Sequence, residues 1–200
     1  SLEPGAARLL FGILKYNTTL TELDLSATSI DHASLPDFAK ALHANRALIS
    51  LDMSDTPAVD GSKYDTSSGA DSDGRSAPAP RLSKGVEAKV NPKVLHAFAE
   101  AVGASPTLQK IVLEGGELPV QLLKGGHAGG VRTKTLDLSR LQLSFISGVH
   151  IGALIRENQM ITELNLASNE LGPDGMTLIV NQLHACSSLN SLDLCNNMHA

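Results

Sequence analysis

The feature that most constrains the fold of this 200-residue chain is an internal repeat. Apolar residues recur six times in the pattern L-x-x-L-x-L-x-x-(N/T)-x-L. The second apolar residue of each copy, here called the marker residue, is in turn Leu23, Leu51, Ile111, Leu136, Leu164 and Leu192. Successive markers are 28, 60, 25, 28 and 28 residues apart. Repetition at a fixed period indicates an array of similar units that stack along one direction.

The residues before each marker predict a helix. Starting 16 residues before the marker, the positions i, i+3, i+4 and i+7 form one face of a helix, and five of the six units have apolar or small residues there. The unit before Leu136 fails, because Lys124 and His127 stand in the face. It is also the unit that is shortened to 25 residues, so the two irregularities agree.

Each unit is therefore predicted to be a short strand, a turn and a helix, in an α/β fold. Stacking would place the six markers in one buried column. A second column would contain Leu25, Met53, Leu113, Leu138, Leu166 and Leu194. We expect one continuous parallel sheet on one side and the helices on the other. Because helices are wider than strands, the sheet would lie on the concave side.

Composition excludes several classes of protein. No apolar run approaches the roughly 18 residues of a membrane-spanning helix, so we expect no direct membrane insertion. The net charge of −5 and the absence of Trp argue against sequence-independent binding of nucleic acid. Cys186 and Cys195 are too few for a disulfide framework, and the first residues lack a secretion signal, which favours a cytoplasmic location.

The stretch 161–194 resembles a leucine-rich repeat of the ribonuclease-inhibitor type. Its turn Leu171-Gly172-Pro173-Asp174-Gly175 is similar to the L-G-x-x-G helix entry of that family. The family's Asn position is occupied by Asn169 and Asn197, by Thr28 and Thr56, and by Gly116 and Leu141, which offer no polar side chain. The resemblance implies one leucine-rich repeat domain over residues 1–200, a horseshoe section of about six units, that binds proteins and has no catalytic activity.

Within that type, the irregular repeat lengths and the order LDLS, IVLEGG, LDLSRLQL, LNLASNEL loosely resemble the repeat region of CARMIL-like actin-capping regulators. This second resemblance implies a scaffold of the actin cytoskeleton or of another large assembly. Two alternatives stay open, namely a GTPase regulator that acts through rim loops and a purely structural component of a large complex.

Residues 57–91 separate the second and third units and are rich in Ser, Gly, Pro, Asp and Ala. A segment with so few large apolar residues cannot offset its ordering entropy by burial. We expect an inserted flexible loop, and a decayed repeat unit is the alternative. The first unit lacks its strand and the last lacks its helix, with no polar cap at either end, so we also expect flanking repeats or domains.

Side chains between the buried leucines should point out of the concave sheet, because strand side chains alternate. These positions hold seven acids and a single base, Lys110. The candidate partner-binding residues are Glu22, Asp24, Asp52, Glu114, Asp137, Glu163, Asn165 and Asp193. Such a face would attract a protein partner with a basic surface. The other interpretation is that Asp is simply common in L-D-L segments of these repeats.

Other motifs predict no cofactor, metal site or catalytic group. The glycine-rich piece 125–133 has Val131 where a phosphate loop needs Lys. His184, Cys186, Cys195 and His199 do not match any zinc spacing. Arg140 follows the fourth marker strand at the rim of the sheet and is a candidate contact residue for a GTPase.

Overall fold

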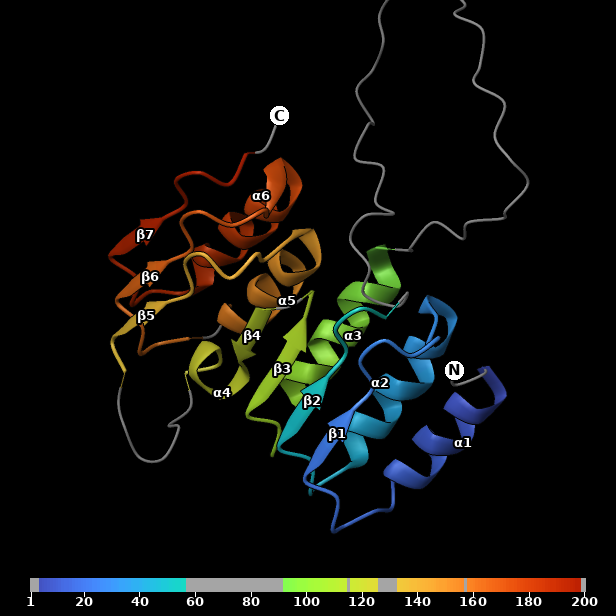
Figure 1. Ribbon diagram of the computed structural model, residues 1–200. Coiled ribbons are helices and arrows are strands. Elements are labelled where there is room, and N and C mark those ends of the chain that lie inside the picture. The colour runs from blue at the N-terminus through green and yellow to red at the C-terminus, as the bar shows by residue number, and fades with distance from the viewer. Residues whose placement is uncertain (1–3, 57–91, 115, 126–132, 157, 199–200) are drawn as a thin grey trace, which may run out of the picture.

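The computed structural model describes residues 4–56, 92–114, 116–125, 133–156 and 158–198. Strands form one layer and helices the other, and the units follow one another from α1 at one end to α6 and β7 at the opposite end (Figure 1). The predicted insert at 57–91 lies outside the described residues. No helix within the described ranges is long and apolar enough to cross a membrane.

The helices are α1 (Pro4–Leu14), α2 (Leu35–Ala44), α3 (Pro92–Ala104), α4 (Val120–Leu123), α5 (Phe145–Ile155) and α6 (Gly172–Gln182), with short 3-10 turns η1 (His32–Ser34) and η3 (Leu183–Ala185). The strands are β1 (Glu22–Asp24), β2 (Ser50–Asp52), β3 (Lys110–Leu113), β4 (Gly116–Pro119), β5 (Thr135–Asp137), β6 (Glu163–Asn165) and β7 (Ser191–Asp193).

The marker residues pair in register, but in two groups of three. Leu23, Leu51 and Ile111 are Cα partners across the parallel strands β1, β2 and β3. Leu136, Leu164 and Leu192 are partners across β5, β6 and β7. The interior markers are buried, whereas Leu23 and Leu192 at the two outer edges are half-buried. The fold thus has parallel strands and helices in repeated units, as predicted.

The prediction of one continuous parallel sheet is wrong. The strands form a sheet of order β1-β2-β3-β4 and a separate sheet of order β5-β6-β7. β4 turns back and pairs antiparallel with β3, with Ile111 opposite Leu118. A side chain would not fit at Gly116, because its Cβ would lie 2.4 Å from Leu143 Cδ2 and 2.9 Å from the Leu141 carbonyl oxygen.

The break falls in the shortened unit whose helical face failed. Val120 and Leu123 are buried, but the helix α4 that contains them has only four residues and ends before Lys124. Side-chain hydrogen bonds hold α4 from both sides. Gln121 Nε2 donates to the Leu108 carbonyl at 2.7 Å, and Asn158 Nδ2 donates to the carbonyls of Leu122 and Leu123 at 2.8 and 2.9 Å. The short unit therefore fills the space with a hairpin and a single helical turn.

The helix layer continues across the break, because α3 packs directly on α5. Aromatic side chains line this layer. Phe11 stacks on Phe38 with ring centroids 4.3 Å apart, Phe38 contacts Phe98 at 5.5 Å, and Phe98 meets His150 edge-on at 5.8 Å. Helices α1, α2, α3 and α5 are therefore joined by one line of ring contacts through the core.

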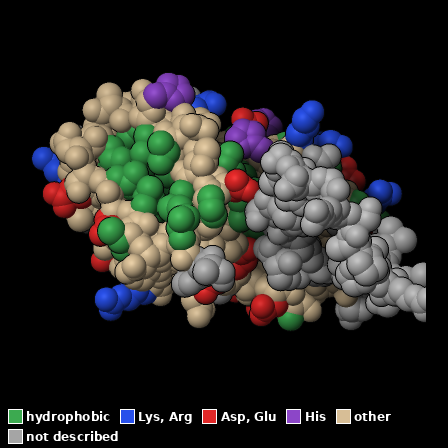
Figure 2. All heavy atoms as spheres, turned by 90° about the horizontal axis from the view of Figure 1, so that it is seen from above, with side chains coloured by type: hydrophobic (Ala, Val, Ile, Leu, Met, Phe, Trp, Pro, Cys, Tyr) green, Lys and Arg blue, Asp and Glu red, His purple; other side chains and the backbone are tan. Residues whose placement is uncertain are grey.

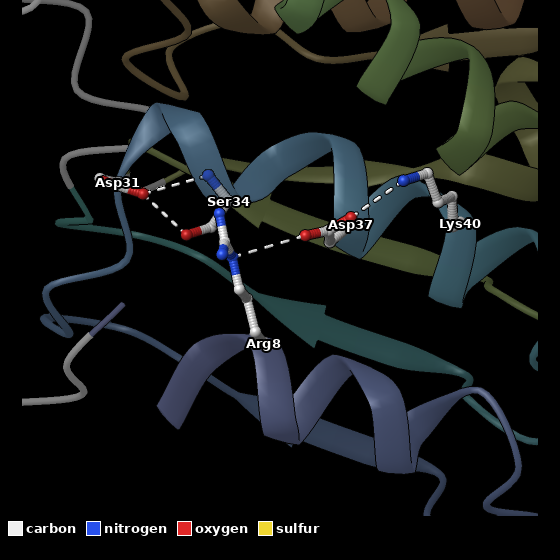
Figure 3. Close-up of polar contacts among 5 residues, drawn as sticks. All are labelled: Arg8, Asp31, Ser34, Asp37 and Lys40. Atoms are coloured by element: carbon white, nitrogen blue, oxygen red, sulfur yellow. Dashed lines mark hydrogen bonds and ion pairs between the residues drawn. The ribbon is translucent and has the colours of Figure 1, made fainter. Parts of the chain in front are cut away.

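Local sequence sets where the helices begin. Asp31 caps η1, the turn that leads directly into α2, since its Oδ1 accepts from the backbone N–H of Ser34 at 3.1 Å and from Ser34 Oγ at 2.7 Å (Figure 3). Arg8 of α1 pairs with Asp37 of α2, with Arg8 Nε 3.7 Å from Asp37 Oδ2 (Figure 3). Within α2, Lys40 Nζ lies 2.9 Å from Asp37 Oδ1 (Figure 3). These pairs are exposed and add little stability compared with the aromatic core.

Truncating Phe38 tests how much the aromatic line contributes. Phe38→Ala is expected to lower the free energy of unfolding by about 3–5 kcal/mol, because it removes a buried ring and leaves a cavity between two others. Chemical denaturation measures this. The control Tyr16→Ala removes an aromatic ring that is 77% exposed and should change stability by less than about 0.5 kcal/mol. If both variants lost the same free energy of unfolding, the buried line of aromatic rings would not be an important source of stability.

The buried His150 makes stability depend on pH. The pKa of His150 is lowered from 6.5 to about 4, mainly by desolvation and to a smaller extent by the charge of His96, while a hydrogen bond to the Ile146 carbonyl acts in the opposite direction. Its Nε2 has no hydrogen-bond partner among the described residues. Below pH 6.5 the unfolded chain binds a proton that the folded chain cannot. The free energy of unfolding should therefore fall by about 3 kcal/mol as the pH drops from 6.5 towards 4.

His150→Leu should flatten this pH dependence, because leucine is apolar and does not titrate. Chemical denaturation at several pH values between 4 and 6.5 measures the slope. His43→Leu, at an exposed position in α2, is the control and should keep the slope of the unmodified chain. If His150→Leu retains the full slope, then the pH dependence arises elsewhere.

Candidate interaction surface

The outward-facing residues of the strands form two acidic groups. The first, here called the β1–β2 group, contains Glu22, Asp24 and Asp52, and pairing places Asp24 opposite Asp52. The second, the β5–β7 group, contains Asp137, Glu163, Asn165 and Asp193, with Asp137 opposite Asn165 and Asn165 opposite Asp193. All these side chains are exposed or half-buried, as expected for the outer face of a strand.

The two groups do not form one continuous column. On β3, the apolar residue Val112 stands opposite Asp52 of β2. The next strand, β4, forms the edge of the first sheet. Lys110 on β3 is the base that was predicted on this face. Its Nζ lies 3.5 Å from Oε2 of Glu117 on β4, an acid that was not among the predicted residues. The structure therefore separates the acidic residues by an apolar position and an ion pair.

The Asp residues of L-D-L have a structural role. The Oδ1 atoms of Asp24, Asp52, Asp137 and Asp193 each accept the backbone N–H of the residue two positions on, at 2.8–2.9 Å. Asn165 Oδ1 does the same for Ala167 at 3.0 Å. Each side chain thus stabilises the turn that ends its strand. This hydrogen bond is a physical reason for Asp to recur at this position, whether or not the face binds a partner.

The same hydrogen bonds lower the pKa of Asp24, Asp137 and Asp193. Donation from the Ser26 side chain and backbone lowers the pKa of Asp24. The backbone N–H groups of Ser139 and Cys195 lower the pKa of Asp137 and of Asp193, and the nearby Arg140 lowers that of Asp137 further. Because a hydrogen bond to the ionised form favours it, these groups stay negative well into the acidic range.

Glu114 does not lie on the acidic face. It is half-buried, and its Oε2 accepts from the backbone N–H of Ser144 at 3.3 Å and from Ser147 Oγ at 3.4 Å. These residues start α5, so Glu114 places a negative charge at a helix N-terminus in the neighbouring unit. The prediction of a partner contact assumed a regular strand, whereas the chain turns into β4 at this point and Glu114 has a φ of 48°.

Arg140 occupies a repeated turn position. The residue four after the marker has a positive φ in Ala27, Asp55, Arg140, Ser168 and Asn196. The backbone N–H of Arg140 donates to the Ala167 carbonyl at 3.1 Å, and Ala27 and Ser168 make the corresponding bonds to the next unit. The side chain is exposed at the rim, as predicted, but the position itself serves the turn.

Two further polar positions recur in the repeat units, and one of them lies outside the apolar pattern from which the repeat was identified. Asn17, Asn45, Ser105, Asn158 and Cys186 all stand six residues before a marker. Asn45 Nδ2 donates hydrogen bonds to the carbonyls of Leu14 and Asn17 in the preceding unit. Its Oδ1 accepts from the backbone N–H groups of Ala47 and Leu48, so Asn45 connects two units. Counting back from the markers would have found this position, because Asn repeats there three times.

The recognised Asn position behaves similarly. Asn169 Nδ2 donates to the Leu138 and Leu166 carbonyls at 2.8 Å, and its Oδ1 accepts from Leu141 and Leu143. The turn at Leu141, which has no polar side chain of its own, is thus held by the next unit. The hydroxyl groups of Thr28 and Thr56 donate within their own turns, to the carbonyls of Leu25 and Met53.

The residues with a superficial metal-binding pattern are not brought together. Cys186 is buried with its Sγ 3.2 Å from the Asn158 carbonyl, and Cys195 is exposed on the strand side. His184 lies at the surface of η3, and His199 is outside the described residues. Within the part of the chain that the structure describes, no three His, Cys, Asp or Glu side chains are placed to hold a metal ion. Most of the glycine-rich piece, at 126–132, is also outside the described residues.

Substitutions at Arg140 separate the turn from the side chain. Arg140→Gly should leave the free energy of unfolding unchanged or raise it by up to about 1 kcal/mol, since glycine adopts a positive φ without strain. Arg140→Val should lower it by about 1–2 kcal/mol, because a branched side chain crowds this conformation. Thermal denaturation compares the two variants. A loss for Gly as large as that for Val would instead show that contacts of the arginine side chain stabilise the turn.

Comparison with known proteins agrees with the repeat. A family model described as "Leucine Rich repeat" matches residues 16–31, around β1, and residues 157–180, around β6 and most of α6. The comparison with curated proteins returns no match. Among solved structures, one titled "Leiomodin-1 Actin-Binding Site 2 (ABS2)" aligns at 14% identity over 92% of this chain and 76% of that chain, with a TM-score of 0.43. The family match and the repeated strand–helix units together support a leucine-rich repeat protein.

Proposed function

We propose that this chain is a non-catalytic protein-interaction module, a horseshoe section of a leucine-rich repeat solenoid of the ribonuclease-inhibitor type. Its strand side would bind a basic surface of a protein partner. The observation that carries the proposal is the set of carboxylates on the outer face of the strands, which are exposed or half-buried and which their turns hold in place. Asp24 lies beside Asp52 on adjacent strands, and Asn165 on β6 stands between Asp137 and Asp193.

The hydrogen-bonded turns favour binding in two ways. Each Asp side chain is already restrained before a partner arrives, so less conformational entropy is lost on association. Neighbouring strands lie roughly 4.8 Å apart, so the negative charges of a group reinforce one another. Such a surface accelerates encounter with a positively charged partner, and salt weakens the effect.

The break between the sheets defines two docking areas. A partner that contacts both acidic groups would need two basic clusters, with a gap that spans Val112, Lys110 and Glu117. The resemblance to CARMIL-like regulators makes components of the actin cytoskeleton the first partners to test. The two cysteines, which are both free, fit the reducing conditions of the cytoplasm that we propose as its location.

Removing charge without disturbing the turns tests the proposal. The quadruple variant Asp24→Asn, Asp52→Asn, Asp137→Asn and Asp193→Asn keeps an oxygen acceptor at each position, as Asn165 does in the native chain. Binding of a Lys/Arg-rich probe peptide, measured by titration calorimetry at low salt, should weaken by about tenfold or more, because four exposed charge contacts are lost. The remaining affinity should depend less on salt.

The matched control replaces Asp37 and Asp174 with Asn and Glu100 with Gln, at positions on the helices α2, α6 and α3 rather than on the strands. This control should retain the affinity and the salt dependence of the unmodified chain. Circular dichroism should show that both variants are folded. If the quadruple variant binds as well as the control, the acidic groups do not form the docking surface and the Asp residues serve the turns alone.

A further inference from the structure

One set of contacts joins the two sheets, and we call it the seam. On one side of it lies the N-terminal half, with α1 to α3 and β1 to β4, and on the other side the C-terminal half, with α5, α6 and β5 to β7. No strand pairing joins β4 to β5 among the described residues. The halves therefore meet through the packing of α3, α4 and β4 on α5 and through side-chain hydrogen bonds from Glu114 and Asn158.

His150 lies at the seam, on the side of α5 that faces α3. Its ring meets Phe98 of α3 edge-on, with centroids 5.8 Å apart, and its side chain is fully buried. The helices approach closely here, since a Cβ added to Gly103 of α3 would lie 3.3 Å from Leu154 Cδ2 of α5. Other histidine side chains lie at the surface, as Figure 2 shows from above in purple. His150 thus differs from them in being a titratable group inside the core.

The hydrogen bond of His150 determines where a second proton would bind. Nδ1 lies 2.9 Å from the Ile146 carbonyl oxygen, which can only accept, so the neutral ring carries its proton on Nδ1. Nε2 is then the unprotonated nitrogen, and it has no hydrogen-bond partner among the described residues. A proton on Nε2 would create a charged N–H group without an acceptor, which costs free energy in an apolar interior. The closed seam therefore favours the neutral ring.

The charged groups around α5 do not offset this cost. Titratable and charged residues on α5 and on the elements around it are Lys93, His96 and Glu100 of α3, Glu114 after β3, Glu117 of β4, Lys124 after α4, Arg156 after α5 and Asp174 of α6. Of these groups, His96 shifts the pKa of His150, and it lowers this pKa because two positive charges repel each other. Its effect adds to that of burial, and the pKa of His150 in the closed seam is about 4.

A cavity lies close to this ring at the seam. It has a volume of about 340 Å³, and its lining includes His96 and Gly103 of α3 and Leu154 of α5. Leu154 follows His150 by about one helical turn, so the two side chains lie on the same side of α5. A small separation of α5 from α3 would therefore extend water from the cavity to Nε2 of His150.

We propose that the seam is an acid-sensitive joint, at which a proton on Nε2 of His150 favours a state with α5 separated from α3 while each half keeps its own sheet and helices. The break in the strand layer makes such a state possible, because opening the seam disrupts no strand pairing among the described residues. Global unfolding would also expose His150, so the pH dependence of stability alone does not show where the chain opens. The proposal is that the seam opens first.

The effect of pH on this opening has a definite sign. In the open state water surrounds His150 and its pKa returns to 6.5, whereas in the closed state it is about 4. The open state therefore binds the proton more tightly, and it is stabilised relative to the closed state as the pH falls from 6.5 towards 4. Between pH 7 and pH 5 the equilibrium constant for opening should rise about 20-fold.

Two backbone N–H groups of α4 report on the seam. Lys124 and Gly125 donate to the carbonyls of Val120 and Leu122 within this single helical turn. One turn is not stable by itself, and α4 loses its hydrogen bonds from Asn158 when the seam opens. These two N–H groups, the seam reporters, should therefore exchange with solvent each time the seam opens.

Two other N–H groups report on the halves. Met53 donates to the Val112 carbonyl between β2 and β3, and Leu166 donates to the Asp193 carbonyl between β6 and β7. Each of these hydrogen bonds lies within one sheet and stays intact when the seam alone opens. These half reporters should exchange only when their own half unfolds.

Hydrogen exchange of the unmodified chain, followed residue by residue by NMR, tests the proposal. After correction for the intrinsic effect of pH, exchange of the seam reporters should accelerate about 20-fold from pH 7 to pH 5. The half reporters should be protected at least about tenfold more strongly than the seam reporters at both pH values. Equal protection of all four reporters would show that the chain opens only by global unfolding, which would overturn the proposal.

A substitution at His150 tests whether this ring is the group that responds to acid. In His150→Leu, exchange of the seam reporters should change by less than about twofold between pH 7 and pH 5, because leucine binds no proton. The control His43→Leu, at an exposed position of α2, should keep the full acceleration. If the seam reporters of the unmodified chain show no acceleration, or if His150→Leu retains it, then His150 does not control the seam. The first of these outcomes needs no variant, so it decides the question even if His150→Leu does not fold.

Discussion

Packing of each helix on the next is the interaction on which the rest of the structure depends. The sheet stops after β4, but α3 and α5 remain in direct contact, with Phe98 against His150. Burial of apolar surface between neighbours is the main source of stability in stacked units, since no unit can bury its own apolar face. Because the helix layer is continuous, the two sheets stay in one stack although no backbone ladder connects them among the described strands.

Hydrogen bonds between units complement this packing at places where regular structure ends. Asn45 and Asn169 each bond backbone groups of the preceding unit, and Asn158 bonds the end of α4 across the break. Their side chains are buried, where an unsatisfied backbone carbonyl would cost free energy. They therefore satisfy the strand–helix connections and also hold adjacent units at a constant offset.

The acidic residues have a role in the fold that is separate from the docking role that we propose for them. The Oδ1 atom of each L-D-L aspartate accepts a turn N–H, which explains the recurrence of Asp without reference to a partner. The same bond restrains the carboxylate, and hydrogen bonding lowers the pKa of Asp24, Asp137 and Asp193. Both properties favour the electrostatic docking that we propose. Residue pattern alone could not distinguish the two roles, because both predict Asp at the same position. Replacement by Asn separates them, since it preserves the acceptor and removes the charge.

Much of the candidate site followed from strand alternation, which correctly predicted that Glu22, Asp24, Asp137 and Asp193 would be exposed. Glu114 was misplaced because its orientation depends on the hairpin from β3 to β4 and on the start of α5, 30 residues away in the chain. Lys110 was predicted to be the single base on the acidic face. Its ion-pair partner Glu117 lies on β4, a strand that the repeat pattern does not predict. Both differences arise from long-range contacts in the one irregular unit.

The sequence by itself determined the strand–helix units, the buried positions of the markers and the register between regular repeats. It did so because the apolar period of each unit is local and its neighbours repeat the same pattern. Only the tertiary structure decided where the sheet breaks and how α4 and β4 fill the shortened unit. Those outcomes depend on the space between α3 and α5, which a pattern within one unit does not specify.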